Sequence, residues 1–256
     1  VTMPRFDLEG FLRVLQDHRI TRAYLAPPIM LALAKHPLVD KFDLSALDSI
    51  VSGAAPLDAG LERACGQRLD ARIGQGWGLT ETSPVVTFAL NAPGGPRPGS
   101  VGVLLPNTEA RVVDPATGAG VSRGEVGELL VRGPQVMRGY LNAPEATAAM
   151  LDPDGWLHTG DLGRIDQDGY VFVVDRVKEL IKYKGLQVAP AELEAVLLAH
   201  PEIADAAVVP YADEKAGEVP KAFVVARSPL DAEEVMAFVA ERVAPHKKVR
   251  TVEFVD

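Results

Sequence analysis

The chain has 256 residues, 47% of them hydrophobic and 24% charged, and a formal net charge of −9. This composition is that of an ordinary soluble globular protein with one large domain or two smaller ones, and its acidic balance argues against a protein that coats nucleic acid. No apolar run approaches the ~18 residues that span a bilayer, and no signal peptide is recognised. Because the single cysteine, Cys65, cannot form an internal disulfide, we expect a cytoplasmic protein with a buried Cys65 thiol.

Residues 1–70 alternate between helical and strand patterns. Leu8, Phe11, Leu12 and Leu15 recur at helical spacing behind Asp7, which suits an N-cap. Such alternation is typical of a largely parallel sheet, whose ligand loops lie at the carboxyl ends of the strands. The predicted elements are a helix over 7–19, a strand over 22–26 stopped by Pro27 and Pro28, a helix over 29–35, a strand over 49–52 ending at Gly53, and a helix from Pro56 to Leu69.

The pattern changes at about residue 99. Short strands separated by Pro, Gly and Asn turns favour a small antiparallel β-subdomain over about 99–175, and the later residues favour a separate α+β domain. The fold class is therefore α/β, with an αβ sheet layer and the β-subdomain in residues 1–175 and a small α+β domain in residues 176–256. The predicted elements are strands over 101–105, 109–113, 127–132 and 170–174, a helix over 190–199, strands over 206–209 and 222–225, and a helix over 231–243.

A basic segment lies at the start of that second domain. Four cationic residues, from Arg176 to Lys184, fall within nine positions and precede Gly185, where a helix or strand would break. Taken alone, such a charge run is usually a solvated face. Together with Asp161 after a glycine turn and the Gly-rich loop over 75–82, it suggests a site for a nucleotide phosphoester.

Several longer motifs occur in an order and spacing shared with one enzyme family. They are Ser52-Gly-Ala-Ala-Pro-Leu, Gln75-Gly-Trp-Gly-Leu-Thr-Glu-Thr-Ser-Pro, Gly127-Glu-Leu-Leu-Val-Arg-Gly, Gly139-Tyr-Leu-Asn, Gly155-Trp-Leu-His-Thr-Gly-Asp and Asp175-Arg-Val-Lys-Glu-Leu-Ile-Lys-Tyr-Lys-Gly. On these motifs the chain resembles the adenylate-forming enzymes: acyl- and aryl-CoA synthetases, firefly luciferases and peptide-synthetase adenylation domains. Among them it is most similar to the 4-coumarate–CoA ligases, especially the bacterial members. The resemblance implies that residues 1–175 are the C-terminal part of a large adenylating domain and residues 176–256 a small mobile domain.

The resemblance also implies a two-step ligase. A carboxylate attacks the α-phosphate of ATP to give an acyl-AMP and pyrophosphate, and the thiol of coenzyme A then displaces AMP to give a thioester. The implied cofactors are ATP, CoA and Mg²⁺, and the implied partner is a small carboxylic acid such as 4-coumarate. Such chemistry chiefly needs positioning and charge neutralisation, which lysine, arginine, a metal-holding carboxylate and backbone N–H groups provide.

Nucleotide contacts are implied at several positions. Glu81 matches the Mg²⁺-holding carboxylate, and the Thr80 hydroxyl matches a contact to the α-phosphate, although by itself the pair also suits an N-cap. Asp161 matches the residue that accepts the ribose hydroxyls, although an Asp after Gly is often a plain turn residue. Arg176 would hold the ribose or the phosphate. The other implied nucleotide-lining positions are Ala54, Gln75, Gly76 and Trp77, the last standing where the family usually has Tyr.

In the second domain, Lys178 matches the hinge about which the small domain rotates between the two half-reactions. Lys182 and Gln187 match contacts to AMP in the thioester-forming orientation, while Lys184 and Gly185 match contacts to CoA. The catalytic candidates are therefore Thr80, Glu81, Lys178 and Lys182.

Gly53, Gly78, Pro84 and Val85 match the aryl pocket of the 4-coumarate ligases. Glycine at 53 and 78 is expected to leave room for a flat ring. A medium- or long-chain fatty acyl-CoA synthetase, a luciferase-like oxygenase and a carrier-protein-loading domain stay open as alternatives.

Two lysine-bearing motifs of the family are not found in residues 1–256: a Ser/Thr/Gly-rich phosphate loop and a C-terminal Ser-Gly-Lys. Lys247 and Lys248 do not fill the second role, because their context matches the segment that precedes it. We therefore expect that this chain alone forms no thioester, whether it is part of an active ligase or a catalytically dead nucleotide-binding fragment. A cut piece would expose faces meant to be buried, so self-association through residues 1–100 is also expected.

Overall fold

A computed structural model describes residues 3, 5–55 and 57–255. The chain divides into two compact units, unit 1 with residues 1–159 and 163–173 and unit 2 with residues 160–162 and 174–256. None of the described helices combines the length and the apolar character that a bilayer crossing requires.

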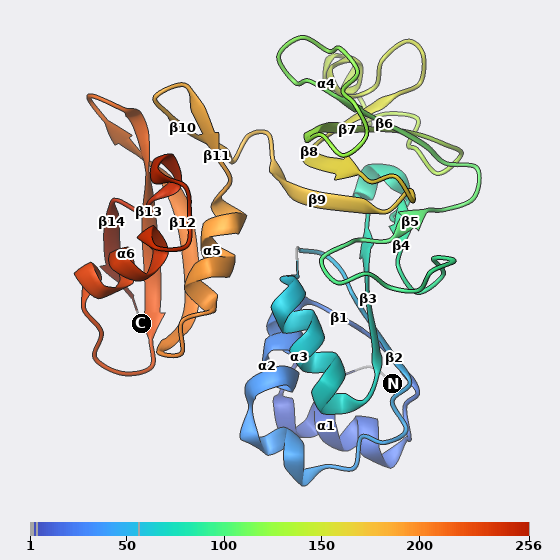
Figure 1. Ribbon diagram of the computed structural model, residues 1–256. Helices are drawn as coiled ribbons and strands as arrows, with labels where there is room; N and C mark the ends of the chain where they lie inside the picture. The colour runs from blue at the N-terminus through green and yellow to red at the C-terminus, as the bar shows by residue number, and fades with distance from the viewer. Residues whose placement is uncertain (1–2, 4, 56, 256) are drawn as a thin grey trace. The chain divides into compact units, whose positions relative to one another are not determined.

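Unit 1 begins with helices packed beside three parallel strands, β1 (Arg22–Leu25), β2 (Ser49–Ser52) and β3 (Arg72–Trp77) (Figure 1). The helices are α1 (Leu8–Asp17), α2 (Pro27–Lys35) and α3 (Ala59–Leu69), and a short 3-10 helix, η1 (Pro37–Lys41), follows α2. Helices and strands share one apolar cluster that includes Leu12, Met30, Ile50 and Cys65. The predicted αβ layer and the buried cysteine are confirmed.

Two helices start at other residues than the sequence pattern predicted. Asp7 caps α1 as expected. The helix α2 includes Pro27 in its first turn, where the missing N–H of proline is not needed, so the prolines begin this helix instead of only ending the strand before it. The helix α3 starts after Asp58, whose carboxylate accepts hydrogen bonds from two N–H groups of the first turn. Pro56, the predicted start, lies outside the described residues.

After these parallel strands, the next strands along the chain pair in antiparallel fashion. β4 (Thr87–Phe88) pairs with β3, and β5 (Val103–Leu104) pairs with β4. A separate sheet has the order β6 (Glu109–Val113), β7 (Gly127–Arg132), β8 (Leu157–Ile165) and β9 (Val171–Arg176), with α4 (Pro144–Met150) between β7 and β8 along the chain. The antiparallel part of the predicted fold class is therefore present.

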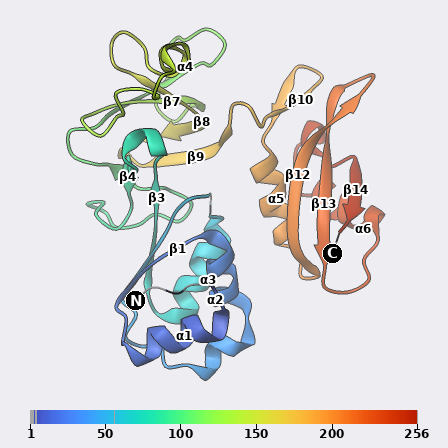
Figure 2. The ribbon, with the colours of Figure 1, turned by 180° about the vertical axis from the view of Figure 1, so that it is seen from behind.

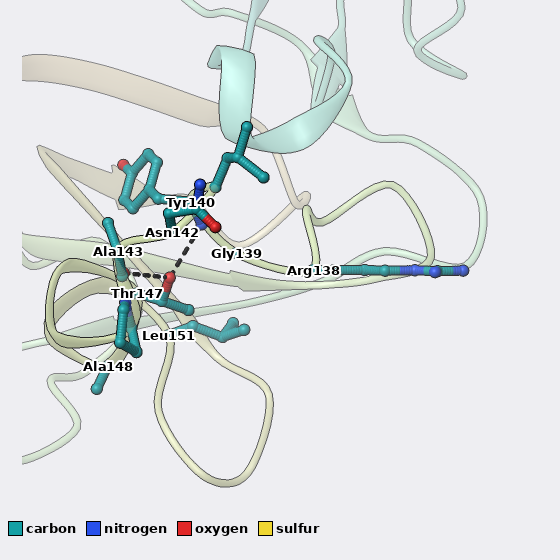
Figure 3. Close-up of a pocket in the computed structure, with 10 residues that line it drawn as sticks. Arg138, Gly139, Tyr140, Asn142, Ala143, Thr147, Ala148 and Leu151 are labelled. Carbon is teal, nitrogen blue, oxygen red and sulfur yellow. Dashed lines mark hydrogen bonds between the residues drawn. The ribbon is translucent and has the colours of Figure 1, made fainter.

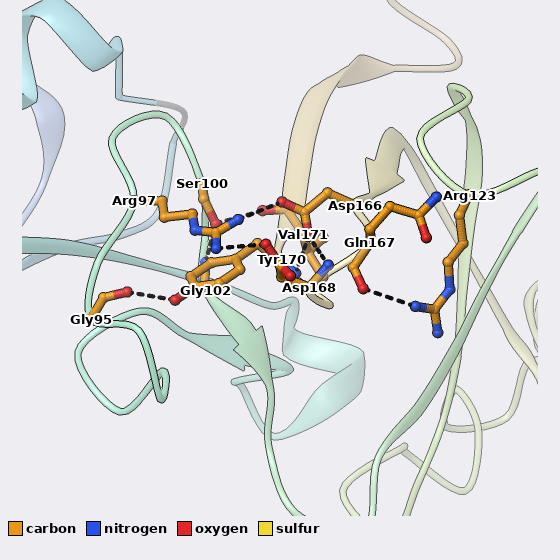
Figure 4. A network of polar contacts seen from close by, with 10 residues as sticks. All are labelled: Gly95, Arg97, Ser100, Gly102, Arg123, Asp166, Gln167, Asp168, Tyr170 and Val171. Carbon is orange, nitrogen blue, oxygen red and sulfur yellow. Dashed lines mark hydrogen bonds and ion pairs between the residues drawn. The ribbon is translucent and has the colours of Figure 1, made fainter.

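A group of polar contacts joins the turn between β8 and β9 to the loop before β5 (Figure 4). The guanidinium of Arg97 lies 3.0 Å from Asp166 Oδ2 and 2.7 Å from Asp168 Oδ2, and 3.9 Å from the centroid of the Tyr170 ring. The Tyr170 hydroxyl donates to the Gly95 carbonyl oxygen at 2.9 Å. These contacts hold the turn between β8 and β9 in place.

The sheet of unit 2 has the order β11 (Leu186–Val188), β10 (Ile181–Tyr183), β13 (Gly217–Ala226) and β12 (Ile203–Asp213), and β14 (Thr251–Phe254) pairs parallel with β13. The helices α5 (Pro190–Leu198) and α6 (Ala232–Ala240) lie beside this sheet (Figure 2), and a 3-10 helix, η3 (Pro245–Lys247), precedes β14. β12 and β13 are longer than predicted because their pairing continues through residues 210–213 of β12 and 217–220 of β13. β14 was not predicted.

Candidate functional site

The Gly-rich loop begins inside β3, where Gly76 pairs with β4, and turns into a 3-10 helix, η2 (Thr80–Thr82). Leu79 is the N-cap residue of η2, and its N–H donates to the buried Thr82 hydroxyl at 2.9 Å. Thr80 and Glu81 therefore do not cap this turn, so the alternative interpretation of the pair as an N-cap is wrong. Thr80 is exposed and Glu81 half-buried, which leaves both side chains near the surface.

Glu81 is held by a second segment, residues 137–140. The Tyr140 hydroxyl donates to Glu81 Oε1 at 2.6 Å, and the Met137 N–H donates to the Glu81 carbonyl oxygen at 2.7 Å. The hydrogen bond to the carboxylate raises the pKa of Tyr140, which keeps the phenol protonated as a donor. The sequence placed Tyr140 in a family motif without assigning it a role.

An open hollow, drawn in Figure 3, is lined by residues 138–144, 147, 148 and 151. It lies between the loop that carries Tyr140 and the helix α4. None of the residues predicted to line the acyl pocket or the nucleotide is part of this lining. The hollow is therefore not the predicted substrate pocket.

Gln75 and Trp77 are deeply buried. Gln75 Nε2 donates to Glu62 Oε2 at 2.9 Å and to the Leu57 carbonyl at 3.1 Å, and its Oε1 accepts from the Leu57 N–H at 3.2 Å. Glu62 also accepts from the Gly99 N–H at 2.9 Å, and burial raises the pKa of its carboxyl group. Trp77 is 8% exposed inside an apolar cluster. The Gln75 side chain thus holds the loop after β2 in place.

The predicted acyl-pocket residues lie beyond the ends of β2 and β3. A Cβ added to Gly53 would find no atom closer than 3.8 Å, and the neighbouring Ala54 is exposed with φ +73°. At Gly78, however, a Cβ would overlap the carbonyl oxygen of Pro84 and lie 2.8 Å from the Cα of Val85. Backbone atoms therefore already fill the space that a side chain at position 78 would take, and a ring beside Gly78 stays a prediction.

In unit 2, Asp161 lies within the strand β8 and not in a turn. It is 6% exposed, and Gly160 before it has φ +70°. Asp161 Oδ1 lies 3.4 Å from Nε of Arg176, whose side chain is 65% exposed. The Val177 N–H donates to the Gly160 carbonyl at 2.8 Å, which joins the two strands beside this pair. Two predicted ribose-side residues thus stand together, although the turn interpretation was wrong.

The rest of the basic segment folds into the hairpin of β10 and β11. Lys182 stands directly opposite Gln187, so the two exposed side chains share one face of the hairpin. Lys184 and Gly185, with φ +48° and +80°, form the turn between the strands, as the predicted break at Gly185 required. Lys178 is exposed in the turn before β10.

Two carboxylates, the buried Asp175 and the half-buried Glu194, join α5 to neighbouring strands. Asp175 accepts from the Arg176 N–H at 2.7 Å and from the Ala191 N–H, in the first turn of α5, at 3.2 Å. Glu194 of α5 accepts from the Val208 N–H at 2.8 Å. Burial raises the pKa of both carboxyl groups. The sequence singled out neither residue for this role, since Ala191 and Val208 lie on other elements than the carboxylates they contact.

Comparison with known proteins shows what the chain resembles. The family described as "AMP-binding enzyme" matches residues 1–141, and the one described as "AMP-binding enzyme C-terminal domain" matches residues 192–256. The 4-coumarate-CoA ligase 2 of Narcissus pseudonarcissus is 51% identical over 261 residues, which cover 100% of this chain and 46% of that protein. The 4-coumarate–CoA ligase 1 sequence of Glycine max is 48% identical, covering 99% of this chain and 89% of that sequence. The chain thus spans about half the length of most of the curated relatives it matches.

Solved structures agree with this grouping. The ATP-bound RpMatB-BxBclM chimera B1 superposes with a TM-score of 0.91 at 35% identity, over 100% of this chain and 51% of the other. The O-succinylbenzoate coenzyme A synthetase MenE from Bacillus subtilis, in complex with ATP and magnesium ion, superposes with a TM-score of 0.84 at 30% identity, over 98% and 51%. The 4-coumarate ligases of Narcissus pseudonarcissus and Glycine max are plant proteins, so a particular likeness to the bacterial 4-coumarate ligases stays a prediction.

Proposed function

Because this chain belongs to the AMP-binding enzyme family, we propose that the protein carrying it is an ATP-dependent carboxylic acid–CoA ligase. An oxygen of the acid would attack the α-phosphate of ATP, forming an acyl-AMP and releasing pyrophosphate. The CoA sulfur would then attack the acyl carbonyl, and AMP would leave. The observation that carries the proposal is the half-buried carboxylate of Glu81, which follows a parallel strand at its carboxyl end and accepts a hydrogen bond from Tyr140.

The carboxylate of Glu81 is the kind of oxygen ligand that suits a magnesium–nucleotide. Mg²⁺ in such sites is usually held by one or two carboxylates together with phosphates and waters. Among the described residues no three His, Cys, Asp or Glu side chains form a group that could hold a metal ion, and Glu81 offers one carboxylate. When bound, Mg²⁺ would neutralise charge on the phosphates. The exposed Thr80 hydroxyl next to it would donate to an α-phosphate oxygen.

In unit 2 we assign the nucleoside end of the substrate to Asp161 and Arg176. The Asp161 carboxylate would accept from the ribose hydroxyls, beside the Arg176 guanidinium 3.4 Å away. Lys182 and Gln187, which share one hairpin face, would contact AMP in the second step. The remaining assignments are Lys178 as the pivot and Lys184 and Gly185 as CoA contacts.

For the acid, we propose 4-coumarate or a related aryl carboxylate. Support comes from the 48–51% identity to the two 4-coumarate ligases above and from the open space beside Gly53. A medium- or long-chain fatty acid is the competing substrate. We further propose the cytoplasm as the compartment, where the buried Cys65 thiol would stay reduced.

The test is an assay of the whole protein that carries these residues, with ATP, Mg²⁺, CoA and a panel of cinnamates, benzoates and fatty acids. We expect pyrophosphate release and thioester formation to be fastest with a hydroxycinnamate. Lys182→Ala should lower thioester formation by about 100-fold, whereas Lys215→Ala, an exposed loop lysine of the same unit, should not. Nucleotide binding with no pyrophosphate release for any acid would contradict the ligase and indicate a nucleotide-binding protein instead.

A further inference from the structure

Glu81 is fixed at both its side chain and its backbone by one short segment. Besides the 2.6 Å hydrogen bond from the Tyr140 hydroxyl to Oε1, the Met137 N–H donates to the Glu81 carbonyl at 2.7 Å. Tyr140 lies 59 residues from Glu81 along the chain, so this contact is a product of the tertiary fold. A glutamate with one oxygen occupied by a phenol has a restricted side-chain orientation and keeps the other oxygen for a further ligand.

The segment that carries Tyr140 is itself tied to α4. The Tyr140 N–H donates to Thr147 Oγ1 at 2.9 Å, and the Thr147 hydroxyl donates to the Ala143 carbonyl at 2.9 Å (Figure 3). Gly139 has φ +146°, and a Cβ there would lie 2.7 Å from Thr147 Cγ2 and 2.9 Å from its Oγ1. Glycine at 139 therefore lets the backbone approach Thr147 closely enough for the hydrogen bond to form.

These contacts form a continuous path from α4 to the carboxylate: Thr147 fixes the backbone of Tyr140, and Tyr140 fixes one oxygen of Glu81. Groups that hold a metal-binding carboxylate by hydrogen bonds commonly change metal affinity by about 10–100-fold when they are removed.

We propose that Tyr140 is a positioning residue that orients Glu81 toward magnesium-bound nucleotide, and that Thr147 holds Tyr140 in place for this. The inference rests on the proposed function, because it takes Glu81 as the carboxylate that meets Mg²⁺. It adds a residue to the machinery of that site and names the element, α4, that supports it.

The experiment measures ATP binding to the whole protein by calorimetry, once with Mg²⁺ and once with EDTA. The ratio of the two dissociation constants reports how much the metal contributes. Tyr140→Phe, which removes only the hydroxyl, should reduce that ratio about tenfold while leaving the affinity in EDTA unchanged. Tyr24→Phe, a change at an exposed tyrosine of β1, is the matched control and should leave both values as they are.

A second pair of variants separates positioning from folding. Thr147→Val removes the hydroxyl at similar volume and should reduce the ratio in the same direction, whereas Thr147→Ser keeps the hydroxyl and should restore it. In an E81Q background, Tyr140→Phe should have no further effect, because the two side chains act as one unit.

The results distinguish the two proposals. If the unchanged protein binds ATP more tightly with Mg²⁺ and Tyr140→Phe has the same ratio, the positioning role is overturned while the proposed function stands. If Thr147→Val and Thr147→Ser behave alike, the path through α4 is overturned. If the unchanged protein binds no nucleotide in either condition, the proposed function fails, and this inference fails with it.

Discussion

In unit 1 the candidate side chains are held by neighbours, whereas in unit 2 most of them project from an exposed hairpin. Glu81 accepts a hydrogen bond from Tyr140, and the Gln75 side chain donates hydrogen bonds to Glu62 and to the Leu57 carbonyl. Lys182 and Gln187, by contrast, are exposed on short strands. Both groups of residues lie in motifs that the sequence shows equally well. The side chains in unit 1 have protein partners, however, whereas those on the hairpin are exposed to solvent.

The difference separates two ways of losing function. Changes to the framework of unit 1 should alter stability and site geometry together, because buried donors and acceptors are left unpaired. Changes on the hairpin of unit 2 should remove a ligand contact and little else, because exposed side chains contribute little to folding. The following substitutions test this contrast, and both tryptophans of the chain, Trp77 and Trp156, report on unit 1 by fluorescence.

The largest effect is expected at Gly78. Gly78→Ala should destabilise unit 1 by about 3 kcal/mol, because the added methyl overlaps the Pro84 carbonyl and the backbone must move. Denaturant unfolding followed by tryptophan fluorescence measures this. Gly118→Ala is the control: its φ is +71° but no atom lies within 4 Å of a Cβ, so it should cost only about 1 kcal/mol. Equal losses for the two variants would contradict the close packing at Gly78.

A smaller loss is expected at Glu62. Glu62→Ala should cost about 2 kcal/mol, because Gln75 and the Gly99 N–H would each lose a buried acceptor. Arg63→Ala, one residue further along α3 and exposed, should change the free energy of unfolding by less than about 0.5 kcal/mol. If the two variants unfolded at the same denaturant concentration, the framework role of Glu62 would be refuted.

In unit 2, a gain in stability is expected at Glu194. Burial raises its pKa in the folded state above 4.5, so the charged form costs stability once the pH rises through that folded value. Glu194→Gln keeps an oxygen to accept from Val208 and removes the charge, so it should stabilise unit 2 at neutral pH by on the order of 1 kcal/mol.

This gain should shrink as the pH falls through the raised pKa, and disappear below about pH 4.5, where the glutamate is protonated in both states. Hydrogen exchange of the amides in β12 and β13, measured at several pH values, would show it. Glu234→Gln on the exposed side of α6 should show no such pH dependence. A gain at Glu194 that grows toward acid would have the wrong sign and reject the explanation.

The smallest effect on stability is expected on the hairpin. Lys182→Ala and Gln187→Ala should each change the unfolding free energy of unit 2 by less than about 0.5 kcal/mol, because both side chains are exposed. Hydrogen exchange in β13 measures this. A loss above about 1 kcal/mol would show that the hairpin, like unit 1, depends on its candidate side chains for folding.

Part of the fold follows from patterns between near neighbours. The Asp7 cap, the parallel strands with their helices and the turn at Lys184-Gly185 were predicted because caps, periodicity and glycine act over a few residues. Boundaries were less well predicted. Pro27 begins a helix, and Asp161 lies in a strand, since long-range pairing outweighed the local turn signal.

The sequence by itself determined the family, the αβ and antiparallel layers, and the motifs in which the candidate residues stand. Only the tertiary structure decided how those residues are supported: Tyr140 reaches Glu81 across 59 positions, and Glu62 reaches Gly99 across 37. It also showed that Gly78 is needed for close backbone packing against Pro84 and Val85. The physical reason is range, because a hydrogen bond or an overlap between distant residues leaves no periodic trace along the chain, whereas caps, turns and apolar faces do.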